Sequence, residues 1–199
     1  LGIPMHRIEV DVTRLGGGFG GKEDQASAWA ALVALAAFIL KKPVKLAMHR
    51  MDDMRMTGKR HPYSSDFKIG LSKDLKILAY EATFHQNAGA AADLSPAVME
   101  RTLFHATNSY FVPNVEVTAY SCRTHLPPNT AFRGFGGPQG MFVIESAIAK
   151  AAQELGVSAR EIQRRNLMHE GSEFSYGQIA EHLNAAPAWE LADRTFDFD

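Results

Sequence analysis

The tetrapeptide Gly-Phe-Gly-Gly occurs twice, at residues 18–21 and 134–137, and each copy stands directly before a helical sequence pattern. Glycine lets the backbone turn sharply and approach a ligand closely, and a helix N-terminus offers unpaired N–H groups and a positive potential. Two such loops can therefore face one anionic or oxygen-rich ligand. The plainer alternative is that both are tight turns with a phenylalanine in the core, since glycine is the usual turn residue.

The first loop matches parts of two nucleotide-binding motifs but completes neither. Gly16, Gly21 and Lys22 fit the start of a phosphate-binding loop. Glu23 then replaces the Ser or Thr hydroxyl that holds magnesium in such loops. A dinucleotide-binding fold requires an acidic residue about 20 positions further on. Residues 41–45 (KKPVK) supply none, so both nucleotide sites are disfavoured.

The composition is that of an ordinary soluble globular protein: of 199 residues, 46% are hydrophobic and 22% charged. A formal net charge of -1 gives no general attraction for nucleic acid or anionic lipid. Cys122 has no second cysteine for a disulfide, and no run of ~20 apolar residues could span a bilayer. We therefore expect a cytoplasmic protein without nucleic-acid or membrane partners. Because the sequence begins at Leu1 rather than methionine, we also expect a piece of a longer polypeptide.

Hydrophobic periodicity predicts an α+β fold of mixed α and β elements, and 199 residues are enough for one sizeable core or two small ones. Strands are predicted at 6–13, 45–49, 64–70, 77–86 and 115–123, with a turn at Ser72-Lys73-Asp74. Helices are predicted at 26–40, at 96–106 and from Pro138 to about Leu155, with Gly156 ending the last and Ser158 capping the next. The first of these helices is apolar on every side, which indicates a buried helix packed between other layers.

Three long motifs occur in a fixed order: GGGFGGKE (16–23), MERTLFH (99–105) and NTAFRGFGGPQG (129–140), with RHPY (60–63) and NAGAAADLS (87–95) between them. Together they resemble the molybdenum-cofactor domain of the xanthine dehydrogenase/xanthine oxidase family. The match runs through most of the chain, and it implies that residues 1–199 are a fragment of this one domain, with no separate second domain. It implies a molybdenum-dependent oxidoreductase with molybdopterin as cofactor.

The resemblance also implies which residues lie beside the cofactor. These residues are Gly18, Phe19, Gly20, Arg133 and Gly134. In the family, the backbone at Phe19 and Gly20 faces the oxygen ligands of molybdenum, and Arg133 contributes from the opposite side. The metal is held by the dithiolene sulfurs of the pterin, so no Cys/His cluster is required.

Substrate contacts carry over in the same way. The family uses Glu23 and Arg101 to grip a purine, Phe135 to stack on the heterocycle and Phe132 to press on it from another direction. An arginine suits this role because it stabilises the negative charge that develops on the ring. The alternatives from the residues alone are a surface cation at Arg101, a first-turn acid at Glu23 that complements the helix dipole, and core packing for the two rings.

The implied activity is hydroxylation of purines such as hypoxanthine and xanthine, a step of purine catabolism, with water as the oxygen source. The family's general-base glutamate has no counterpart here, so the chain holds no catalytic residue and should be inactive alone. The [2Fe-2S] clusters and FAD would lie on other domains or subunits of a homo- or hetero-oligomer, with NAD or oxygen as the final electron acceptor. An aldehyde- or carbon monoxide-oxidising relative, or a silent relative without metal, remains an alternative.

Overall fold

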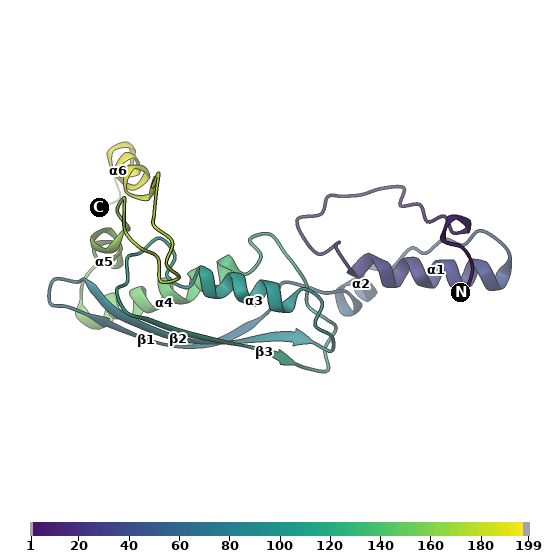
Figure 1. Cartoon of the computed structure of the whole chain (residues 1–199), viewed down its shortest axis with the longest axis horizontal. Coiled ribbons are helices and arrows are strands. Elements are labelled where there is room, and N and C mark those ends of the chain that lie inside the picture. Colours follow the sequence, from purple (N-terminus) through teal and green to yellow (C-terminus); the bar gives the residue numbers. More distant parts are fainter. Residues whose placement is uncertain (1, 197–199) are drawn as a thin grey trace. The chain divides into compact units, whose positions relative to one another are not determined.

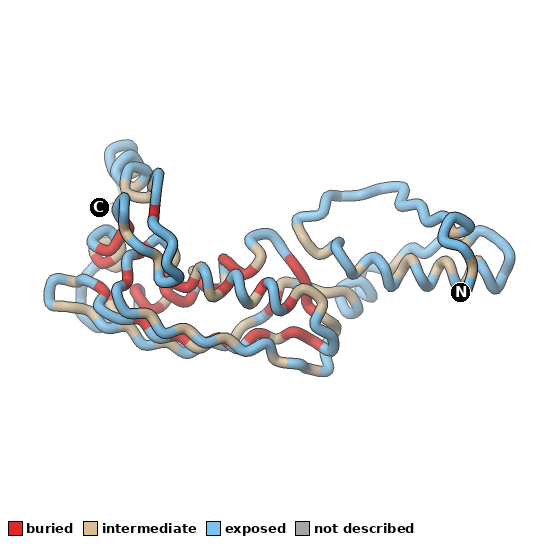
Figure 2. Tube along the Cα trace, viewed as in Figure 1, coloured by how far each residue is buried: buried red, intermediate tan, exposed pale blue. Residues whose placement is uncertain are grey.

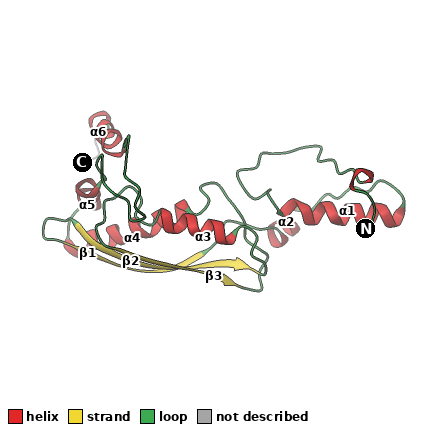
Figure 3. Cartoon of the chain, viewed as in Figure 1, coloured by secondary structure: helices red, strands yellow, loops and turns green. Residues whose placement is uncertain are grey.

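The structure, a computed structural model, describes residues 2–196 and has the expected α+β fold (Figures 1 and 3). The elements are η1 (Met5–Arg7), α1 (Gln25–Leu40), α2 (Arg50–Met56), β1 (Tyr63–Leu71), β2 (Ile77–Gly89), α3 (Ser95–Phe104), β3 (Val115–Arg123), α4 (Gly137–Leu155), α5 (Ala159–Asn166) and α6 (Ala185–Thr195). The chain divides into two compact units. The first unit contains Leu1–Pro62, Asn87–Val98 and Ser121–Phe135, and the second contains Tyr63–Gln86, Met99–Tyr120 and Gly136–Asp199.

The second unit is built around a three-stranded sheet in the order β1-β2-β3, and its three strands form where the sequence patterns predicted them. β1 and β2 are antiparallel, and the turn between them closes with a 3.0 Å hydrogen bond from the Leu75 N–H to the Ser72 carbonyl. Tyr80 and Phe84 of β2 pack in one buried cluster with Ile144 and Ile148 of α4. The apolar face of this sheet is thus covered by the long helix.

Helix α4 begins and ends as its sequence predicts. A proline stands in its first turn, and Gly156, with φ of 67°, ends it in the left-handed conformation that glycine adopts without strain. Ser158 is the N-cap of α5. Helix α4 also lies very close to α3, because a Cβ placed on Gly140 would be 2.5 Å from the Thr102 carbonyl oxygen.

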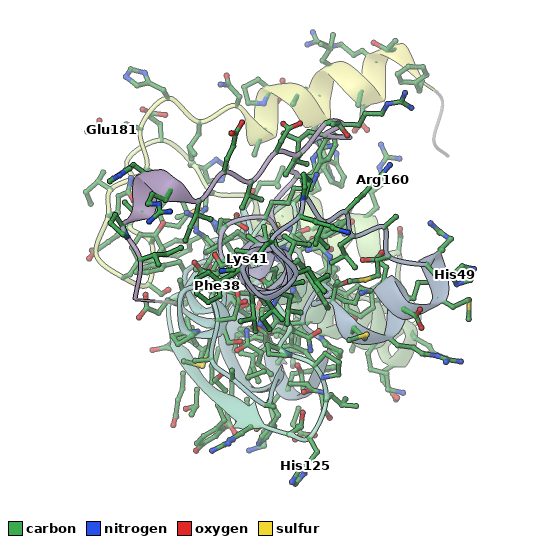
Figure 4. The ribbon with its side chains drawn as sticks, turned by 90° about the vertical axis from the view of Figure 1, so that its right-hand side faces the viewer. Phe38, Lys41, His49, His125, Arg160 and Glu181 are labelled. Atoms are coloured by element: carbon green, nitrogen blue, oxygen red, sulfur yellow. The ribbon has the colours of Figure 1, made fainter. Side chains whose placement is uncertain are left out.

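Helix α1 of the first unit forms over the predicted residues but is not buried, contrary to the prediction. None of its residues is buried (Figure 2). Ile39, for example, is 66% exposed. Its last turn is followed by Lys41, whose Nζ lies 4.0 Å from the centre of the Phe38 ring (Figure 4). An all-apolar helix needs packing on every side, and the described residues supply too little of it. No helix among residues 2–196 is long and apolar enough to cross a membrane.

Two predicted strands of the first unit are also wrong. Residues 8–13 and 45–49 have no regular secondary structure, and only the 3-10 turn η1 forms near the first of them. A strand is stable when a neighbouring strand accepts and donates its backbone hydrogen bonds, and neither segment has such a neighbour within the described chain. Residues 50–56 instead form α2, whose Met51 N–H donates to His49 Nδ1 at 3.3 Å.

Polar side chains hold the rest of the first unit together. Asn129 donates to the Asn87 carbonyl at 2.9 Å, and Thr124 Oγ1 bonds Asn87 Oδ1 at 2.8 Å. The Thr130 N–H donates to the Lys59 carbonyl at 3.1 Å. These bonds fix the irregular segment 124–130, which leads directly into the second glycine loop.

Candidate functional site

The first glycine loop has a backbone that few side chains could adopt. Gly17, Gly20 and Gly21 have φ of 102°, 82° and 85°, and Phe19 has φ of 51°. A phenylalanine at positive φ is strained by about 1–2 kcal/mol, and such strain clusters at functional sites. The Phe19 ring is 67% exposed, so core packing does not explain its position. Turns of this kind can gather successive N–H groups into an anion-binding concavity.

The second loop shares part of this conformation. Gly134, Phe135 and Gly136 have φ of 89°, 49° and 99°. The Phe135 N–H donates to the Phe132 carbonyl at 2.8 Å, which closes the turn. Both copies therefore have a left-handed phenylalanine followed by a left-handed glycine, whereas Gly134 is left-handed and its counterpart Gly18 is not.

The first loop lies directly against the segment that opens the second. A Cβ placed on Gly20 would be 3.0 Å from the N and Cα atoms of Phe132, and one on Gly21 would be 3.2 Å from the Ala131 carbonyl oxygen. The sequence predicted that the two loops face one ligand. The structure brings the first loop against Ala131 and Phe132, just before the second loop, and the shared site stays a prediction. Among residues 2–196, no group of three or more His, Cys, Asp or Glu is placed to hold a metal ion. Closely packed backbone with N–H donors instead fits a group that presents oxygen atoms.

Glu23 is exposed just before α1, and the neighbouring Gln25 fixes the start of that helix. Gln25 Nε2 donates to Asp93 Oδ2 at 2.8 Å and to the Pro128 carbonyl at 3.2 Å, while its Oε1 accepts from the Gly58 N–H at 3.1 Å. Three distant segments thus meet at one side chain. Sequence reasoning missed Gln25, because a glutamine in a first helical turn carries no signal of such contacts.

Arg60 is a second residue that the sequence reasoning missed. Its guanidinium carbon lies 4.6 Å from the centre of the Phe132 ring, and its Nη2 donates to the Arg133 carbonyl at 2.6 Å. It belongs to the RHPY stretch of the motif pattern, but nothing in that stretch indicated a partner. Phe132 and Arg133 themselves are exposed.

Next to Arg60, His61 is buried, and its Nε2 lies 2.7 Å from Ser95 Oγ. Burial lowers the pKa of His61 below its usual 6.5, and the negative charge of Asp93 partly offsets this. The unfolded chain therefore takes up the proton first as the pH falls. The contribution of His61 to the free energy of unfolding is therefore fully present above pH 6.5. It declines as the pH falls below 6.5 and is lost once the pH has passed the pKa of His61 in the folded protein.

We expect the urea midpoint to fall between about pH 7.5 and about pH 5, and His61→Gln to flatten this dependence. His125→Gln, at an exposed position, is the matched control and should leave the dependence unchanged. Identical pH profiles of the wild type and His61→Gln would contradict the assignment.

Arg101 lies in the second unit, exposed on α3. Its charge helps to lower the pKa of His105, after burial as the larger cause. The adjacent Thr102 is fully buried, and its Oγ1 lies 2.9 Å from Tyr63 Oη and donates to the Gly136 carbonyl at 3.1 Å. The contact partners of Arg101 at the site, including its pairing with Glu23, stay a prediction.

The fold and the paired loops define a cofactor-binding domain, and comparison with known proteins identifies its class. Residues 1–167 match the family model described as the molybdopterin cofactor-binding domain. The chain belongs to this family.

Its relatives are large oxidoreductases. The chain is 43% identical over 190 residues to the xanthine dehydrogenase/oxidase of Gallus gallus and 44% identical to the xanthine dehydrogenase of Oryza sativa, covering 96% of this chain and 14% of each relative. Among solved structures, the aldehyde oxidoreductase of Desulfovibrio gigas matches with a TM-score of 0.82 and 27% identity, over 92% of this chain and 20% of that one. The chain thus spans a small part of the proteins that it resembles.

Proposed function

We propose that the chain is part of a molybdenum hydroxylase that oxidises purines such as hypoxanthine and xanthine, with water as the source of the inserted oxygen. The observation that carries the proposal is the contact of Gly20 with the Phe132 backbone, which places the first glycine loop against the segment that precedes the second. The identity to xanthine dehydrogenases supports the purine as substrate. All 199 residues would then belong to one cofactor-binding domain.

In this proposal, the backbone at Gly18, Phe19, Gly20 and Gly134, together with Arg133, holds the cofactor through its oxygen ligands. When bound, the cofactor supplies the two-electron oxidation of the attacked ring carbon. The close contact at Gly20 leaves no room for a larger side chain, so the first loop is held against the segment that carries Arg133. A backbone fixed in this way needs no rearrangement when charge develops.

The substrate would be held by the chain's own side chains. Phe135 and Phe132 offer flat apolar faces to an aromatic ring. Glu23 would hydrogen-bond a ring nitrogen, and Arg101 would stabilise the negative charge that develops on the ring during attack. Water exclusion around Arg101 would strengthen this effect, because charge interactions grow as the local dielectric falls.

Electrons would leave through [2Fe-2S] clusters and FAD on other parts of a cytoplasmic, oligomeric enzyme, with NAD or oxygen as the final acceptor. A second candidate substrate is an aldehyde, favoured by the similarity to the Desulfovibrio gigas aldehyde oxidoreductase. A third candidate function is that of a catalytically silent relative, which keeps the fold without metal.

One experiment on the complete enzyme separates these candidates. Molybdenum is measured by elemental analysis, and the enzyme is supplied with xanthine or an aromatic aldehyde in ¹⁸O-labelled water. We expect molybdenum, label in the hydroxylated purine and a kcat/KM that favours the purine. A kcat/KM that favours the aldehyde would show that an aldehyde, and not a purine, is the substrate. A molybdenum-free inactive protein would overturn the proposal.

The isolated 199-residue chain should purify with only trace molybdenum. It represents 14% of its relatives' length, and we propose that further segments of the enzyme enclose the pterin. Elemental analysis of the purified chain is the measurement, and the complete enzyme prepared in parallel is the control. Near-stoichiometric molybdenum in the isolated chain would show that residues 1–199 already form a sufficient site.

A further inference from the structure

Arg60 connects the two parts of the first unit that meet at the second glycine loop. Two neighbouring backbone segments, 58–60 and 128–133, lie side by side. A Cβ on Gly58 would be 2.4 Å from the Pro128 carbonyl oxygen, and the Lys59 N–H donates to Asn129 Oδ1 at 3.3 Å. The backbone that carries Arg60 is therefore fixed on the side facing this segment.

The side chain of Arg60 then extends this contact to the proposed site. Its guanidinium lies over the Phe132 ring at 4.6 Å and donates through Nη2 to the Arg133 carbonyl at 2.6 Å. The first contact restrains a ring, and the second restrains the backbone that follows it. An arginine can do both at once, because its planar group stacks on an aromatic face while its N–H groups point outward in the plane.

The surroundings of Arg60 do not favour the stability of the folded protein. Its Nη1 is buried and has no hydrogen-bond partner among residues 2–196. A buried donor without a partner costs free energy, which a neutral side chain of similar length would avoid. The arginine is thus better explained by what it orients than by what it stabilises.

We infer that Arg60 is a positioning residue, which sets the angle of the Phe132 ring and the path of the backbone at Arg133. This inference rests on the proposed function for its catalytic consequence. Arg60 does not contact the substrate in this scheme. It restricts Phe132 to the orientation in which the ring can press on a bicyclic heterocycle, so a small aldehyde, which does not reach that ring, depends on it much less.

The test uses the complete enzyme with three variants: Arg60→Met, Arg60→Lys and, as a matched control, Arg164→Met. Arg164 is exposed and bonds Glu161 at 3.3 Å within α5. For Arg60→Met we expect kcat/KM for xanthine to fall about 10- to 100-fold, mainly through a higher KM, since a ring contact and a charged hydrogen bond are both lost. Molybdenum content should stay near that of the wild type, and kcat/KM for an aliphatic aldehyde should fall at most about threefold. Arg60→Lys should recover part of the xanthine activity.

A second measurement does not depend on the substrate. Hydrogen–deuterium exchange of the peptide covering residues 130–137 should rise in Arg60→Met and stay unchanged in Arg164→Met. Unchanged exchange overturns the inference whatever the enzyme acts on, as does equal loss on both substrates together with loss of molybdenum. If the wild type has no purine activity but hydrogen–deuterium exchange still increases in Arg60→Met, the proposed substrate is wrong and the positioning role is supported. If Arg60→Met does not accumulate, Arg60→Lys gives the same comparison, and wild-type exchange and activity in that variant overturn the inference.

Discussion

Replacing Arg101 with methionine in the complete enzyme should lower kcat/KM for xanthine by roughly 30- to 1,000-fold, or about 2–4 kcal/mol of transition-state stabilisation. Methionine keeps an apolar side chain of similar length but removes the charge that would stabilise the developing anion. Because this interaction is made mostly in the transition state, kcat should fall together with kcat/KM. Steady-state kinetics with xanthine on the wild type and the variant measure the effect.

The controls for Arg101→Met are a second substrate and a second arginine. An aromatic aldehyde lacks the distal oxygen of the purine, and Arg164→Met removes another exposed charge, from α5, so neither should show the large loss. Removing Arg101 should also raise the pKa of His105, because the arginine charge now lowers it. Equal losses for the purine and the aldehyde would mean that Arg101 supports the fold or the cofactor instead of the substrate.

Gly89→Ala should be among the most destabilising single changes in the chain. Gly89 ends β2 with φ of 84°, and an added Cβ would lie 2.3 Å from the Pro127 carbonyl oxygen. Left-handed strain and overpacking against backbone together predict a loss of roughly 2–5 kcal/mol in the free energy of unfolding. Urea denaturation followed by circular dichroism measures this loss.

Gly156→Ala is the matched control for Gly89→Ala. Gly156 also has positive φ, 67°, but a Cβ there would meet no atom within 4 Å. It therefore reports the backbone strain alone, about 1–2 kcal/mol. Equal losses at the two positions would show that the segment at Pro127 moves aside and that the close contact has little importance.

The sequence predicted the helices and strands of the second unit well because these elements pack against one another. The alternating pattern of β2 is buried against α4, and Pro138, Gly156 and Ser158 mark helix ends through local backbone preferences. Residues 6–13 have an equally clear alternation but form no strand. Alternation reports only that one face prefers burial, whereas a strand also requires a partner for its backbone.

The candidate site was predictable where backbone chemistry depends on the local sequence. The glycine loops were visible because only glycine adopts such conformations freely. Arg60 and Gln25 were not visible, since their partners lie 73 and up to 103 positions away in the chain. A side chain that acts through a distant partner leaves no mark in its own neighbourhood.

The left-handed phenylalanine at position 135 sets thermal robustness against the proposed activity. Glycine or asparagine would adopt the same backbone with less strain, so a screen that rewards heat resistance alone would favour these residues at this position. The winners of such a screen would lose the aromatic ring that the proposed enzyme stacks on its substrate. Laboratory evolution of this domain therefore needs turnover as a second criterion, applied in every round.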